Sequence, residues 1–166
     1  MDCKILILKL NIVALQNLFF QEFYCSKLQE QIDMLPHDKE IQTLWPHLKA
    51  KVPNLFNNLS IKPSLLHGDL WSGNAGQVGS SPAIFDPASF YGHHEYDLGI
   101  AGMFGGFSSN FYSSYHKLIP KEDGFEQRHL LYKLFHNLNH WNHFGGGYKS
   151  GSLSLIKKLI HDSIKL

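Results

Sequence analysis

The sequence predicts an α+β domain that is mainly helical and contains one small β-hairpin. Several segments carry apolar residues at three- and four-residue spacings, which is typical of amphipathic helices. A cluster of turn-forming residues at 76–82 separates a strand expected around 74–77 from the apolar run 83–85, as in a hairpin. The 166 residues are 43% hydrophobic and 17% charged, which is enough apolar material for one globular core.

The expected helices follow one another along the chain and are bounded by prolines, glycines or polar residues. Pro36 ends the first, and Pro46 lies inside the second, where we expect a kink or a restart. Ser152 is the expected N-cap of the last helix. The expected helical ranges are 19–35, 38–52, 95–104, 110–118, 125–144 and 152–166.

Composition and charge exclude several classes of protein. The formal net charge of +1 does not predict a nucleic-acid-binding or polybasic membrane surface. Cys3 and Cys25 lack C-x-x-C spacing, so we expect no disulfide framework and a reducing, cytoplasmic location. Residues 1–20 are too short and too polar to span a membrane, and Lys9 interrupts their apolar run. We interpret residues 1–18 as a packed helix or leader, with a targeting segment as the alternative.

The most informative stretch, residues 67–86, reads H-G-D-L-W-S-G-N, a short spacer and then I-F-D-P-A. Asp69 follows an apolar run, Asn74 comes five residues later, and Asp86 ends a second apolar run. A carboxylate at Asp69 can orient a hydroxyl group and accept its proton. Asn74 and Asp86 supply the oxygen ligands that Mg²⁺ prefers. Together they have the spacing of the protein-kinase catalytic loop and its metal-binding aspartate, which indicates phosphoryl transfer.

A structural interpretation of the same residues competes with the catalytic one. Asp69 and Asn74 are also common turn residues, and Asp86 could be a cap before Pro87. D-x-x-x-x-N alone is frequent by chance. Its combination with H-G-D, two flanking apolar runs and a second aspartate is far more specific, so we favour the catalytic interpretation.

Longer motifs then add a resemblance to a known family. The chain contains L-L-H-G-D-L-W-S-G-N, D-P-A-S-F-Y-G-H-H-E-Y-D-L, M-F-G-G-F and L-N-H-W-N-H-F-G. These motifs resemble the fructosamine kinase (ketosamine-3-kinase) family, which is related to aminoglycoside phosphotransferases and choline kinases. The resemblance implies that residues 19–166 form the C-terminal lobe of a protein-kinase-like fold. It also implies ATP- and Mg²⁺-dependent phosphorylation of the sugar 3-hydroxyl of ketosamines on glycated proteins or small amines, a deglycation repair reaction.

The resemblance assigns roles to further residues. It implies that Asp69 is the catalytic base, that Asn74 and Asp86 bind the metal, and that His67 and Asp97 support the catalytic loop. Trp71 could stack on the sugar or the amine-bearing chain, or could be a core tryptophan. His140, Trp141 and His143 are weaker substrate-site candidates, whereas Met103 and Phe104 are expected in the core. A zinc site at His136, His140 and His143 is disfavoured, because the glutamate of H-E-x-x-H is missing.

No N-terminal nucleotide-binding lobe is recognisable in the sequence. The phosphate-binding motif G-x-x-x-x-G-K-[ST] is absent, and neither glycine-rich stretch, at 76–79 or 145–147, has the context of a kinase glycine loop. We therefore expect this chain to be weakly active or inactive alone. Two alternatives remain: a non-catalytic lobe that binds a ketosamine or a partner, and a phosphotransferase acting on choline or an aminoglycoside.

Overall fold

The computed structural model describes residues 18–57 and 59–162, in which helices and two small antiparallel sheets form the α+β fold that the sequence predicts. The described helices are α2 (Leu18–Asp33), α3 (Lys39–Lys49), α4 (Tyr96–Ala101), α5 (Ser109–Leu118), α6 (Phe125–Phe144) and α7 (Lys149–Asp162). The 3-10 helices are η1 (Val52–Phe56), η2 (Ser72–Asn74) and η3 (Gly146–Tyr148). The strands are β1 (Ser64–Leu66), β2 (Ala75–Val78), β3 (Ser81–Ile84) and β4 (Phe90–Gly92). Most of the expected leader, residues 1–17, lies outside the described residues.

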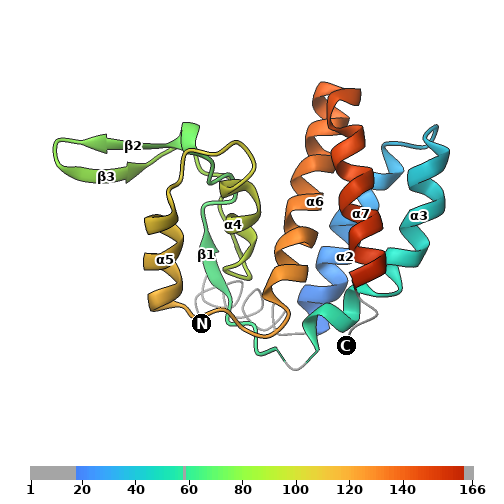
Figure 1. Ribbon diagram of the computed structural model, residues 1–166, viewed down its shortest axis with the longest axis horizontal. Helices are drawn as coiled ribbons and strands as arrows, with labels where there is room; N and C mark the ends of the chain where they lie inside the picture. The colour runs from blue at the N-terminus through green and yellow to red at the C-terminus, as the bar shows by residue number, and fades with distance from the viewer. Residues whose placement is uncertain (1–17, 58, 163–166) are drawn as a thin grey trace, which may run out of the picture.

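A bundle of α2, α3, α6 and α7 forms one side of the molecule, and α4, α5 and the strands form the other (Figure 1). α6 is central, because it packs against α7, α2 and α4. The core runs through this bundle and is built from apolar side chains at helical spacing, including Leu28 and Ile32 of α2, Leu131 and Leu138 of α6, and Ile156 of α7. None of the helices in the described ranges is long and apolar enough to cross a membrane.

The β2–β3 hairpin projects away from the bundle (Figure 1), with Ala75 paired to Ile84 and Val78 paired to Ser81. Its turn is shorter than the cluster 76–82, because residues 76–78 belong to β2 and residues 81–82 belong to β3. The hairpin follows η2 directly, so it begins where the catalytic motif ends. It therefore separates Asn74, just before β2, from Asp86, two residues after β3.

Local details differ from the sequence-based expectations. Phe90–Gly92, between the expected hairpin and the expected helix 95–104, forms the short strand β4 and pairs with β1. Helix α7 begins at Lys149, so Ser152 lies inside it and donates from its Oγ to the Tyr148 carbonyl at 2.9 Å, instead of acting as an N-cap. Helix α3 contains Pro46 without a break in its assigned range, and Asp38 caps its N-terminus by accepting the Ile41 N–H at 3.1 Å.

Candidate active site

The loop after β1 carries Asp69 and turns sharply at Gly68. Gly68 has a φ of +83°, a backbone conformation that residues other than glycine rarely adopt. A Cβ atom at this position would lie 2.1 Å from the carbonyl oxygen of Ala88. The H-G-D and D-P-A segments therefore pass each other in direct backbone contact, which only glycine permits.

Asp97, in the first turn of α4, holds this loop from behind. Its two carboxylate oxygens accept the backbone N–H groups of His67 and Gly68, each at 2.8 Å. Burial raises the pKa of the Asp97 carboxyl, while the two N–H donors act in the opposite direction. Asp97 therefore contacts directly the loop that the resemblance expects it to support.

The His67 ring links the two halves of the motif. Its Nε2 lies 3.0 Å from the carbonyl oxygen of Phe85, which can only accept, so Nε2 carries a proton. Its Nδ1 accepts the backbone N–H of Asp69 at 3.3 Å. Both contacts are satisfied by the neutral Nε2–H tautomer, and together they tie Asp69 to the residue preceding Asp86.

Asn74 is buried and lies against Asp69. Its Nδ2 donates to the backbone carbonyl oxygen and to Oδ2 of Asp69, both at 3.0 Å. Because a carboxylate only accepts, the amide nitrogen must face Asp69, and Oδ1 is the atom of this amide that is left for another ligand. The Asn74 carbonyl also accepts the Phe85 N–H at 3.0 Å.

Asp86 is exposed and follows Phe85, whose backbone is fixed on one side by His67 and on the other by Asn74. Asp86 is the described non-glycine residue with a positive φ, +56°. Such a conformation is costly for a residue with a side chain and clusters at functional sites. One hydrogen-bonded network thus joins Asp69 and Asn74 and ends one residue before Asp86. The Oδ1 atom of Asn74 and the carboxylate of Asp86 are oxygen donors of the type that Mg²⁺ prefers.

A cavity of about 340 Å³ opens beside Asp69. The other residues that line it are Trp71, Phe104, His140, Phe144 and Tyr148. Trp71 and His140 are two of the four substrate-site residues that the sequence predicted. Phe104 was expected in the core, but its side chain is 45% exposed and forms part of the cavity wall, so that expectation is wrong.

Trp141 and His143 do not belong to this lining. Trp141 is 8% exposed and packs in the core, with the Lys149 ammonium 5.8 Å from its ring centroid. His143 is exposed, and its Nδ1 lies 2.8 Å from the Asn139 carbonyl oxygen. Phe144 and Tyr148 line the cavity in place of Trp141 and His143. The packing of η3 against the end of α6 brings these two rings to the cavity.

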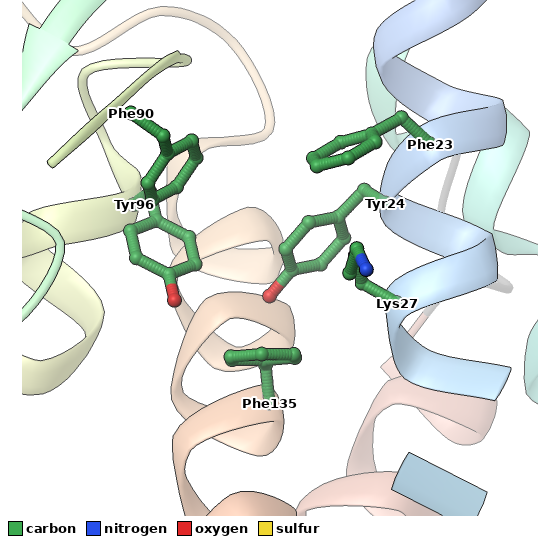
Figure 2. A pocket seen from close by; sticks show the side chains of 6 residues that line it. All are labelled: Phe23, Tyr24, Lys27, Phe90, Tyr96 and Phe135. Atoms are coloured by element: carbon green, nitrogen blue, oxygen red, sulfur yellow. The ribbon is translucent and has the colours of Figure 1, made fainter. Parts of the chain in front are cut away.

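A second cavity, of about 230 Å³, lies between α2, β4, α4 and α6. Figure 2 shows the rings of Tyr24 and Tyr96 on opposite walls and Phe135 at the floor. Phe23, Lys27 and Phe90 complete the lining. No residue of the catalytic motif lines it, so it is separate from the Asp69 cavity.

The side chains of His93, His94 and Glu95 also approach one another, with possible ligand atoms within 4.8 Å. However, both carboxylate oxygens of Glu95 accept hydrogen bonds from Arg128 at 2.8 Å, and His93 Nδ1 is 2.8 Å from the Tyr132 hydroxyl. A metal ion there would lie beside a buried guanidinium, which is electrostatically unfavourable. We assign this group a structural role.

Comparison with known proteins identifies the family. The sequence profile described as fructosamine kinase matches residues 14–162. The chain belongs to the fructosamine kinase family. It is 58% identical over 142 residues to the ketosamine-3-kinase of Mus musculus, covering 83% of this chain and 46% of that protein. It is 52% identical over 103 residues to the chloroplastic protein-ribulosamine 3-kinase of Arabidopsis thaliana, covering 61% of this chain and 31% of that protein.

The fold of this fructosamine kinase family member is kinase-like. A crystal structure named "Putative fructosamine-3-kinase" from Haemophilus somnus 129PT superimposes with a TM-score of 0.75 and 27% identity, covering 86% of this chain and 50% of that one. The chain therefore spans half or less of the length of these relatives. Residues 67–86, the candidate catalytic motif, lie inside the span that the family profile matches.

Proposed function

We propose that residues 19–166 form the catalytic lobe of a ketosamine 3-kinase, which transfers the γ-phosphoryl group of ATP to the sugar 3-hydroxyl of ketosamines. The acceptors are ketosamine adducts on lysines of glycated proteins or on small amines. The observation that carries the proposal is the position of Asp69, which lines the cavity and is held by Asn74 in the network leading to Asp86. Family membership supports the same reaction, because relatives are named ketosamine-3-kinase and protein-ribulosamine 3-kinase.

In this reaction Asp69 acts as the base. Asn74 donates to Oδ2 of Asp69, so Oδ1 is the oxygen that receives the proton of the acceptor hydroxyl. The hydroxyl oxygen attacks the γ-phosphorus, the bond to the bridging oxygen breaks, and ADP leaves. Because this chemistry depends on orientation, the contacts of His67 and Asp97 that fix the loop serve catalysis through Asp69.

Mg²⁺ would be held by Oδ1 of Asn74 and the carboxylate of Asp86. When bound, it neutralises charge on the phosphate oxygens. Asp69, which already accepts from Asn74, keeps its other oxygen for the hydroxyl group.

The phosphorylated adduct then falls apart and releases the amine, so the reaction repairs glycated protein. We place this protein in the cytoplasm, since its two cysteines have no pattern of a disulfide framework.

We further propose that the chain alone is weakly active or inactive. It spans less than half of the curated relatives quoted above, and its sequence has no recognisable glycine-rich phosphate-binding loop. Loss of one group that binds the transferred phosphoryl can lower the rate by several orders of magnitude. A nucleotide-binding lobe supplied by another segment would restore it.

A chimera tests this function directly. The matching 142 residues of the mouse ketosamine-3-kinase are replaced by those of this chain, and turnover is measured with ATP and fructosyl-lysine. We expect activity in the chimera, little in the chain alone, and a loss of about 10²–10⁴-fold in kcat for Asp69→Asn. Asp123→Asn, at an exposed aspartate outside the cavity, is the matched control. Full activity of the Asp69→Asn chimera would favour the non-catalytic alternative, and preference for choline or kanamycin would favour the related phosphotransferases.

A further inference from the structure

Five rings form a continuous wall around the Asp69 cavity, which we call the aromatic arc. Its members are Trp71, Phe104, His140, Phe144 and Tyr148. The ring centroids of Trp71 and Phe104 are 5.6 Å apart, and those of Phe104 and His140 are 5.4 Å apart. His140 in turn lies 5.4 Å from Phe144 and 5.1 Å from Tyr148. Each ring therefore touches the next, and the wall continues from the catalytic loop across α6 to η3.

The arc is unusually exposed for side chains of this kind. Trp71 is 36% exposed, Phe104 45% and Phe144 71%. Scattered exposed aromatics are ordinary, but a contiguous set lining one cavity indicates a binding surface. The arrangement leaves ring faces and edges available to a ligand.

The cavity carries one formal charge, and it is negative. Of the described residues that line it, Asp69 is the one with a formally charged side chain, and none is a lysine or arginine. The Nδ1 of His140 lies 2.7 Å from the His136 carbonyl oxygen, which can only accept, so this nitrogen donates a hydrogen bond to it. Aromatic faces are electron-rich. A carboxylate and ring faces together attract a cation.

We propose that the aromatic arc binds the protonated amine of the acceptor, so that the cavity selects organic ammonium compounds over neutral molecules of the same shape. Several aromatic faces around a desolvated cation form the arrangement that recognises quaternary and alkylated ammonium groups. The adduct then lies with its sugar hydroxyl at Asp69 and its nitrogen among Trp71, Phe104 and Phe144. If the cavity bound only a neutral sugar stacked on Trp71, a positive charge on the ligand would not increase its affinity. The identity of the acceptor rests on the proposed function, but the ammonium preference does not.

Choline and 3,3-dimethylbutan-1-ol test the preference for a positive charge without any sugar. The two compounds have the same shape, but the alcohol has a neutral carbon atom where choline has its positively charged nitrogen. Binding to the full chain is followed by tryptophan fluorescence, for which Trp71 is the exposed reporter, since Trp45 and Trp141 are 3% and 8% exposed. We expect choline to bind at least 10-fold more tightly than the alcohol. Equal affinities, or no saturable signal from choline, would overturn the proposal.

Phe144→Leu keeps apolar volume but removes a ring face, and we expect it to lower the choline preference at least threefold. Phe144 is 71% exposed, so the substitution should leave the fold intact, which a circular dichroism melt verifies. Phe23→Leu, at an exposed ring of the second cavity, is the matched control and should leave the preference unchanged. An unchanged preference in Phe144→Leu would overturn the role of the arc.

The same titration with Nα-acetylated fructosyl-lysine and its ether analogue, in which oxygen replaces the side-chain amine nitrogen, connects the arc to the proposed substrate. At least 10-fold tighter binding of the amine supports the inference, and equal binding overturns it. If the protein still prefers choline to the alcohol while neither sugar compound binds, the ammonium preference of the aromatic arc is supported and the ketosamine assignment fails.

Discussion

Asp97 holds the catalytic loop through two backbone N–H groups, which an amide cannot replace. In Asp97→Asn one side-chain oxygen still accepts, but the amide nitrogen faces the N–H of His67 or Gly68, donor against donor. A buried donor left without an acceptor costs about 1–3 kcal/mol. We expect Asp97→Asn to lower the free energy of unfolding by that amount in urea titrations. A matched Asp123→Asn variant, at an exposed site, should change it by less than about 0.5 kcal/mol.

Asp86 gives the opposite prediction, because its backbone is held in the left-handed region. Glycine adopts this conformation without the cost of about 1 kcal/mol or more that a side chain brings, although it also makes the unfolded chain more flexible. We therefore expect Asp86→Gly to be as stable as the wild type or up to about 1 kcal/mol more stable, while losing Mg²⁺-dependent ATP binding in the chimera. Thermal melts and calorimetric titration check the two effects separately. A clear loss of stability would show that the Asp86 side chain stabilises its own conformation.

At the scale of residues, the sequence predicts those contacts that depend on the chemical type of a residue and on short spacing along the chain. Asp69 and Asn74 are separated by five positions, and their direct hydrogen bond follows from one tight loop. Phe144 and Tyr148 carry no such signal. They line the cavity because Gly145 breaks α6 and η3 turns the chain back, which is a tertiary arrangement. Aromatic residues in a helix usually indicate core, and this general rule misplaced Phe104.

Arg128 connects three elements through one buried guanidinium. It forms a two-point ion pair with Glu95 at the start of α4, with both N–O distances at 2.8 Å, and donates to the Leu55 carbonyl in η1 at 3.2 Å. Both partners are 1% exposed. Removing one leaves the other charge buried, which typically costs 3–5 kcal/mol. We expect Glu95→Gln to lose about that much in the free energy of unfolding.

The double variant Glu95→Gln/Arg128→Met distinguishes the pair from packing alone. Because replacing both partners by uncharged residues removes both buried charges, the double variant should recover part of the loss seen in either single variant. Urea titrations of the four proteins give the coupling free energy. If the two single losses simply add, the ion pair does not stabilise the junction of α4 and α6.

At the scale of elements, periodicity located the long helices and missed the short strand. The apolar spacing in 125–144 predicted α6 with its bounds, because most of its buried residues repeat every three or four positions. β4 has three residues, and it is defined by its pairing with β1 more than twenty positions earlier, which no local pattern reveals. α7 begins at Lys149, three residues before Ser152, so Ser152 was a misleading signal for its start.

At the scale of the whole molecule, buried histidines contribute to the way stability depends on pH. Burial lowers the pKa of His93 to about 3, with the charges of His94 and Arg128 acting in the same direction. Burial likewise lowers the pKa of His136 to about 3, beside His140. Burial raises the pKa of Glu95 and of Asp97, and these two carboxyls act in the opposite direction on acidification. The histidine contribution is therefore best isolated by comparing variants.

A histidine whose pKa is lower in the folded protein than in the unfolded chain stabilises the fold. This stabilisation is complete above the pKa of the unfolded chain, about 6.5, and is lost as the pH falls toward the pKa of the folded protein. Between pH 7 and 5.5 the unfolded chain takes up protons at both positions and the folded chain does not, which lowers the free energy of unfolding by about 2–3 kcal/mol for His93 and His136 together. We expect His93→Gln and His136→Gln each to remove about half of this difference, whatever their stability at pH 7. Exposed His37→Gln is the control and should leave the difference unchanged. Urea titrations at the two pH values measure it, and equal pH differences in all four proteins would show that neither buried histidine resists protonation.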